Sequence, residues 1–286
     1  MRLQQKRKLS NMANYTAADV KALRDRSGAG MMDCKNALDE AEGNVDKALE
    51  LLRLKGLKGV TKREGRTTSN GLVVARVEGG VGTMIELACE TDFVAKADKF
   101  VALANKVADG IVAAKAETLE AALAAPLDGR TVADIINDEA AIMGEKVELR
   151  RVAVVKDAAV DSYLHRTSKD LPPQVGVLLA YSGSDAETAH DVAVHIAAFS
   201  PSVLKREDVP AETVETERRI VAETARNEGK PEAALEKIVE GRVNGFFKEN
   251  VLLEQDFAKD NKQSVQKVLD AAGLTVSAFV RFRVGA

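Results

Sequence analysis

The chain has 286 residues, 45% of them hydrophobic and 4% aromatic, and its formal net charge is −3 at pH 7. The nearly balanced charge and the absence of Trp argue against a dedicated nucleic-acid binder, which would carry a basic excess or base-stacking aromatic residues. No apolar run approaches the roughly 20 residues that cross a bilayer, and Cys34 and Cys89 are far apart, so we expect a cytoplasmic protein with free thiols, no membrane contact and no direct nucleic-acid partner.

Residues 1–13 show no hydrophobic periodicity. Lys6, Arg7 and Lys8 form a basic cluster, but no apolar stretch follows it, so the segment is not a secretory signal. We expect a disordered tail, or a start upstream of the natural Met12. A basic RNA-binding arm is the alternative interpretation, and this one cluster is its only support.

Residues 14–56 predict a bundle of three short helices, similar to a ubiquitin-associated domain. Thr16 is a candidate N-cap for the first helix, which stops at Ser27–Gly30, and Asp33 starts the second. The third has apolar residues at i, i+3, i+4 and i+7, namely Val45, Ala48, Leu49 and Leu52. A core of this size is typical of a docking module rather than a catalyst.

Two adjacent methionines, Met31 and Met32, lie between the first two helices of this bundle. Thioethers adapt to the surfaces of partners, so the pair is the expected contact patch. The competing interpretation is that a methionine fills the bundle core, and we expect it to hold for one of the two.

A polar connector rich in Gly and Lys occupies residues 57–70 and is predicted to be a linker. Apolar segments at 71–77 and 81–87 then flank Glu78-Gly79-Gly80, which indicates a β-hairpin. These glycines do not indicate a phosphate loop, because no Gly-rich segment here leads from a strand into a helix with a following Lys-Ser/Thr.

Helical sequence follows over about 94–143, interrupted near Pro126, and 147–156 alternates like a strand. Hairpin, helices and strand together predict a first α+β lobe over residues 71–157.

The segment Glu90–Val94 lies where the hairpin ends and the helical sequence begins. Phe93 beside Asp92 is unusual at such a corner, because a turn of this kind lies on the surface. The alternative is an ordinary helix start, in which Thr91 or Asp92 caps the helix and Phe93 packs back as a hydrophobic staple.

The same order of elements occurs a second time. Strands are predicted at 159–166 and 175–181, a helix at 185–198, and a closing strand at 275–284. We therefore predict an α+β fold with two related lobes on antiparallel sheets, the second lobe comprising residues 158–208 and 253–286.

Residues 209–252 interrupt the second lobe and predict a helical hairpin, a coiled-coil arm. Charged helices at 209–226 and 232–248 carry narrow apolar stripes, and Pro231 fits the first turn of the second helix. The arm is a contact either with a partner or with a second copy. A dimer seam would need a broader apolar face, so we expect a monomeric free protein.

Two other classes of function compete. In an enzyme, Cys34 or Cys89 would act as nucleophile, but neither has a motif around it, and buried structural thiols are expected. His190 and His195 are five apart and do not share a helical face as an i, i+4 metal pair would. We expect no catalytic residue, no metal site and no cofactor. The other class is a non-catalytic helical adaptor built on residues 14–56.

Several motifs occur in one order from Met12 onward. They are Val20–Leu38 (VKALRDRSGAGMMDCKNAL), Glu90–Ala95 (ETDFVA), His195–Ala198 (HIAA), Gly229–Pro231 (GKP), Ile238–Arg242 (IVEGR) and Phe279–Gly285 (FVRFRVG). Together they resemble the bacterial elongation factor Ts family. The resemblance implies an exchange factor, not an enzyme, which promotes GDP release from the GTPase elongation factor Tu in a one-to-one complex.

The resemblance also implies a set of partner-binding residues. Thr91, Asp92, Phe93 and Val94 would enter the GTPase beside its magnesium and nucleotide site, Phe93 as a wedge and Asp92 holding displaced elements. Further contacts with the GTPase are implied for Met31, Met32, Lys35 and His165. The chain stops at Ala286, whereas some family members continue into another helical module, so that contact is expected to be absent or replaced.

Overall fold

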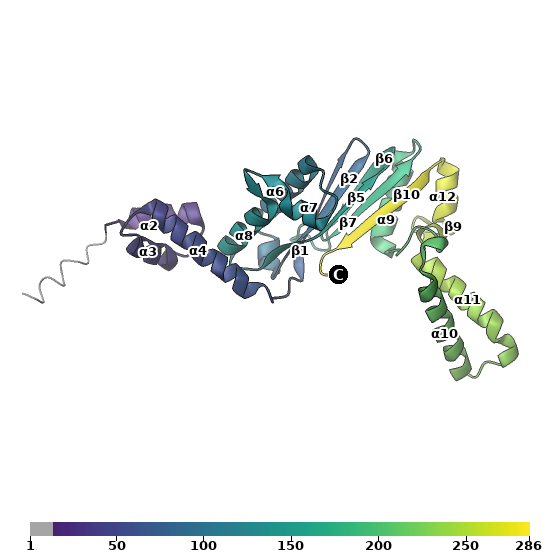
Figure 1. The fold of residues 1–286 in the computed structure, drawn as a ribbon. Helices are drawn as coiled ribbons and strands as arrows, with labels where there is room; N and C mark the ends of the chain where they lie inside the picture. The colour runs from purple at the N-terminus through teal and green to yellow at the C-terminus, as the bar shows by residue number, and fades with distance from the viewer. Residues whose placement is uncertain (1–13) are drawn as a thin grey trace, which may run out of the picture. The chain divides into compact units, whose positions relative to one another are not determined.

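The computed structural model describes residues 14–286, without the side chains of residues 57, 58 and 61, and mixes helices with small sheets (Figure 1). The expectations for residues 1–13 lie outside this range. The predicted α+β class is confirmed. The chain divides into two compact units, the first comprising residues up to 71, 87–150 and 285, and the second 72–86, 151–284 and 286. No helix within 14–286 is long and apolar enough to cross a membrane.

The N-terminal part of the first unit is a three-helix bundle formed by α2 (Ala17–Ser27), α3 (Met31–Glu40) and α4 (Val45–Arg63). Thr16 caps α2 as predicted, in a capping box with Asp19. The small core consists of Val20, Leu23, Cys34, Ala37, Leu38, Ala41 and Ala48.

Helix α4 extends to Arg63, so much of the segment predicted as a linker over 57–70 is helical. The physical reason is close packing on α8 (Val132–Met143). A Cβ on Gly56 would lie 2.7 Å from the Cβ of Ala141, so glycine here permits the approach of two helices rather than ending one.

Strands β1 (Asn70–Glu78), β2 (Val81–Cys89) and β5 (Val147–Lys156) form one sheet in the order β1-β2-β5. Gly79 and Gly80 make the turn between the first two strands, both with positive φ, as the hairpin signal predicted.

The helices α5 (Asp92–Ala95), α6 (Asp98–Ala114), α7 (Leu119–Ala124) and α8 connect this hairpin to β5. The interruption predicted near Pro126 is a two-stranded pair, β3 (Pro126–Leu127) with β4 (Arg130–Thr131). The amphipathic face of α6 is buried through Phe100, Leu103, Val107 and Ile111.

The second sheet has the order β10-β7-β6, with β6 (Ala159–His165), β7 (Val175–Ser182) and β10 (Thr275–Arg283). Both of its strand pairs are antiparallel. The helices α9 (Ala186–Phe199) and α12 (Val265–Ala272) accompany it, and their apolar faces share a core with β7. In each sheet, therefore, the second strand of the pair is central and the closing strand lies beside it.

The pair of helices α10 (Ala211–Asn227) and α11 (Glu232–Asn250) forms the arm inserted into the second unit, drawn in green in Figure 1. Its narrow stripe buries residues on both helices: Val221, Ala225, Leu235, Val243 and Phe247. At the base of the arm, the Arg206 guanidinium lies 4.1 Å from the ring centre of Phe247 and pairs with Glu254. A further strand pair between the arm and α12, β8 (Asp256–Phe257) with β9 (Asp260–Ser264), was not predicted.

Candidate partner-binding site

The segment Glu90–Val94 forms a sharp corner at which β2 gives way to a single helical turn, α5. Thr91 is its N-cap, in extended conformation, and its hydroxyl accepts a hydrogen bond from the backbone N–H of Val94. Ala95 is fully buried, whereas 73% of Phe93 is exposed. The alternative in which Phe93 packs back as a staple is therefore wrong: the small Ala95 takes the inward position of the turn, and the large ring faces outward.

Lys96 covers part of the exposed surface of the corner. Its ammonium lies 4.4 Å from the centre of the Phe93 ring and 3.3 Å from a carboxylate oxygen of Asp92. All three side chains are exposed, so this contact contributes little stability, but it leaves an apolar ring and an acid presented side by side.

Thr91 faces the interior, unlike its two successors. Its backbone N–H and its hydroxyl both donate to the carboxylate of Glu145, at 3.0 and 2.5 Å, and the Cys89 thiol donates to its carbonyl at 3.3 Å. Burial and the nearby Glu145 carboxylate raise the pKa of Cys89 to about 12. The structure thus brings the four predicted residues together, but it separates an inward Thr91 from an outward Asp92 and Phe93.

Glu90 is held from the opposite side. Its carboxylate accepts the backbone N–H of Lys146 at 2.6 Å and pairs with Arg66 at 3.1 Å, and its carbonyl accepts from the Asn70 side chain. Burial opposes ionisation of Glu90, but the bonds from Lys146 and Arg66 outweigh it and lower the pKa. Sequence reasoning missed both Glu145 and Lys146, because nothing local to the motif indicates a partner more than fifty residues away.

The other predicted contact residues of the first unit lie on α3. Met31 and Met32 are 47% and 65% exposed, and Lys35 is exposed as well. The expectation that one methionine fills the bundle core is wrong, because Leu23 and Cys34 fill it completely.

His165 ends β6 in the second unit and is exposed, as a contact residue must be. Its Nδ1 lies 3.1 Å from the Tyr163 hydroxyl. The Tyr163 ring in turn meets His190 edge-on, and His190 pairs with Asp161 at 3.0 Å. Sequence reasoning missed these neighbours, although Asp161, Tyr163 and His165 alternate along one strand face, a period-two signal that could have found them.

The enzyme hypothesis receives no support from the cysteines. Both thiols are buried, as predicted, and the raised pKa of Cys89 disfavours the thiolate that a nucleophile requires. His195 is buried between Gln255 and the backbone N–H of Ala258, whereas His190 is exposed, so the two do not act together. Within residues 14–286, no three His, Cys, Asp or Glu side chains gather as metal ligands would.

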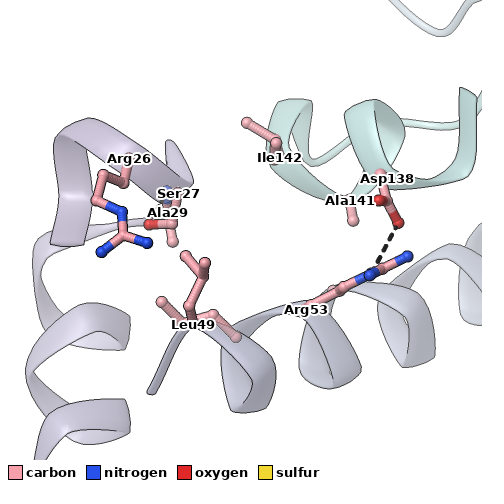
Figure 2. A pocket seen from close by; sticks show the side chains of 10 residues that line it. Arg26, Ser27, Ala29, Leu49, Arg53, Asp138, Ala141 and Ile142 are labelled. Carbon is pink, nitrogen blue, oxygen red and sulfur yellow. Dashed lines mark hydrogen bonds and ion pairs between the residues drawn. The ribbon is translucent and has the colours of Figure 1, made fainter. Parts of the chain in front are cut away.

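A small pocket of about 180 Å³ lies away from the corner, between the bundle and α8 (Figure 2). It is lined mainly by apolar or small side chains, and the ion pair of Arg53 with Asp138, at 3.3 Å, closes one side. Asp138 is also bonded by Arg130. These charges are paired with one another, which indicates a packing gap beside the contact of Gly56 with Ala141 rather than a polar ligand site.

Comparison with known proteins places the chain in a family. The family described as "Elongation factor TS" matches residues 90–286. Proteins named Elongation factor Ts from Clavibacter michiganensis subsp. michiganensis, Renibacterium salmoninarum and Micrococcus luteus are each 64% identical, over 275, 278 and 277 residues. Each alignment covers 96% of this chain and 100% of the relative. The chain belongs to the elongation factor Ts family, a family of translation elongation factors.

Proposed function

We propose that this protein is a guanine nucleotide exchange factor for elongation factor Tu, the GTPase that carries aminoacyl-tRNA to the ribosome. Membership of the elongation factor Ts family supports this partner. The single observation that carries the mechanism is Phe93, an aromatic side chain 73% exposed beside the exposed Asp92, on a turn whose backbone is bonded on several sides. An apolar side chain displayed on a braced turn is suited to insertion into another protein.

Phe93 acts as a wedge in this mechanism. Its ring enters an apolar slot of the GTPase near the magnesium and nucleotide site, and buried aromatic anchors of this kind dominate the energetics of interfaces. Asp92 accompanies the ring and holds the displaced elements of the GTPase. Magnesium, which belongs to the partner, then loses coordination, and GDP is released.

Exchange requires no covalent chemistry in this chain. The factor binds the nucleotide-free GTPase more tightly than the GDP-loaded form, and this difference alone shifts the equilibrium. By linkage, nucleotide and factor weaken each other's binding by the same factor. GTP then completes the cycle by displacing the exchange factor.

Two further contacts anchor the complex away from the wedge. Met31, Met32 and Lys35 of α3 dock on a helix of the GTPase domain, where exposed thioethers adapt to the surface. His165, held by Tyr163, makes a separate contact from the second unit. Such contacts supply affinity without acting on the nucleotide site.

We infer that the free protein is a monomer which forms a one-to-one complex. The apolar residues of the arm are largely consumed in packing α10 on α11, although Ile220 is 47% exposed. Light scattering of the isolated protein at micromolar concentration tests this. A dimer mass that disappears when a short Gly-Ser loop replaces the arm would refute the inference.

The decisive experiment measures release of labelled GDP from elongation factor Tu with and without this protein. We expect substoichiometric amounts to accelerate release, since one factor molecule serves many GTPases in turn. A helical adaptor would bind without accelerating release. Deleting residues 14–56 would abolish binding by an adaptor, but would leave an exchange factor measurable activity at high concentration. No acceleration by the full chain at any concentration would overturn the proposal.

A further inference from the structure

The corner and the turn that follows α8 are joined by reciprocal hydrogen bonds. The Glu145 carboxylate accepts from the N–H and hydroxyl of Thr91, and the Glu90 carboxylate accepts from the N–H of Lys146. Two adjacent pairs of residues, 90–91 and 145–146, therefore each supply a carboxylate to the backbone of the other. Hydrogen bonds to an ionised acceptor are roughly twice as strong as neutral ones, so this connection is strong for its size.

Glu145 is well placed to hold another element. Gly144 ends α8 with a positive φ, and Val147, two residues after Glu145, is a buried residue of β5. The backbone on both sides of Glu145 is thus fixed by secondary structure. Its side chain is half-buried, which limits competition from water for its two bonds to Thr91.

The turn that carries Phe93 needs such support. Helix α5 has only four residues, and a single turn is not stable by itself in water. Of its residues only Ala95 is fully buried, and the outward Phe93 contributes little packing within this chain. The orientation of Phe93 therefore depends on the cap, Thr91, and on what holds the cap.

We propose that Glu145 is a positioning residue for nucleotide exchange, acting through Thr91 to hold the α5 turn so that Phe93 enters the partner in a fixed orientation. This inference rests on the exchange function proposed above. Its physical basis is preorganisation: a wedge already held in its bound position does not lose conformational entropy on insertion, so more of its binding energy reaches the transition state for GDP release.

The test compares Glu145→Ala with a matched control at the other end of the same helix. There the Asp134 carboxylate accepts from the N–H and hydroxyl of Thr131, the N-cap of α8, which are the same two groups that Glu145 binds in Thr91. Asp134→Ala removes this pair of bonds at a distance from the corner. Glu145→Gln, which keeps one acceptor, serves as the conservative variant and decides the question if Glu145→Ala does not fold.

Three measurements are made on the full-length variants: the maximal GDP release rate at saturating factor, the half-saturating concentration, and amide deuterium exchange. We expect Glu145→Ala to lower the maximal rate by about tenfold, the equivalent of one lost charge-assisted hydrogen bond, and the half-saturating concentration to change by less than about threefold. Glu145→Gln should fall between wild type and Glu145→Ala. Deuterium exchange should rise in residues 91–96 only. Asp134→Ala should lower the melting temperature and leave the release rate unchanged.

The failures of the two proposals are distinguishable. If the wild-type protein does not accelerate release, the exchange function itself is wrong. If wild type accelerates release and Phe93→Ala does not, but Glu145→Ala or Glu145→Gln matches wild type, only the positioning role is wrong. A uniform rise of deuterium exchange through residues 87–150, with the rate lowered equally by Asp134→Ala, would show that Glu145 acts through global stability and would also overturn it.

Discussion

The two sheets each lead into a helix through a capped junction, and the two junctions differ in one respect. After β2 the cap is Thr91, and after β7 it is Asp185. Each cap accepts a hydrogen bond from the N–H three residues later, of Val94 in the first junction and Thr188 in the second. Four residues after each cap stands a fully buried alanine, at 95 and 189. The local construction is the same.

The difference lies at the second helical position and behind the cap. That position holds Phe93 in the first junction and the exposed Glu187, an ordinary acid for a helix start, in the second. In the first junction the cap is itself bonded by Glu145, from a distant part of the chain, whereas Asp185 is bonded by its own neighbour Thr188. An apolar side chain turned outward, together with long-range support of its cap, marks the junction that binds another protein.

The largest effect is expected from Phe93→Ala. Truncating an interface anchor typically costs about 2 kcal/mol, so the GDP release rate should fall roughly thirtyfold while the melting temperature is unchanged. The matched control is Glu187→Ala, at the same position of the second junction, which should leave release at the wild-type rate. Full exchange activity in folded Phe93→Ala would remove the wedge from the mechanism.

The caps themselves should separate function from stability. Thr91→Val removes the hydroxyl that joins Val94 to Glu145 and should lower the release rate roughly fivefold, as expected for loss of a cap worth about 1 kcal/mol. Asp185→Ala should instead lower the melting temperature without changing release, since α9 carries no predicted contact at its start. Equal effects of both variants on release would show that the two junctions are functionally alike.

The helix after the second junction should make stability depend on pH. Burial lowers the pKa of His195, only partly offset by its bond to Gln255, so the folded state favours the neutral ring more than the unfolded state does. This contribution is complete above the unfolded value of 6.5 and is lost as pH falls through it towards the lower folded pKa.

Urea unfolding should therefore show stability falling between about pH 7 and 5.5, by at most about 1.4 kcal/mol per pH unit. His195→Gln should be less stable but flatter over this range. The exposed His190→Gln is the control and should keep the wild-type slope. An unchanged slope in His195→Gln would assign the pH dependence to other groups.

The smallest effect is expected from Lys96→Met. It removes the ammonium that lies over Phe93 and pairs with Asp92, but all three side chains are exposed, and exposed ion pairs contribute little. The release rate should fall by less than about threefold, and the difference from wild type should shrink as salt is added. A loss as large as that of Phe93→Ala would place Lys96 itself among the principal contacts.

Local patterns in the sequence determined much of this protein. The hairpin over Asn70–Cys89 follows from alternating apolar residues around Gly79 and Gly80, and the predicted helices and strands of the second unit agree with the structure within about two residues. The outward position of Phe93 also followed from its place at a corner. These features depend on residues two to four positions apart, which the sequence displays directly.

Tertiary structure decided what distant segments do to one another. The extension of α4 through Gly56 depends on Ala141, and the strand pair β8–β9 is polar in sequence, without the alternation that reveals a strand. The support of Thr91 depends on Glu145, 54 positions later. A carboxylate in a turn has no local pattern that names its acceptor or donor, because its partner is chosen by how the helices and strands between them pack. The motif therefore identified the residues of the corner, and only the folded chain revealed what holds them in place.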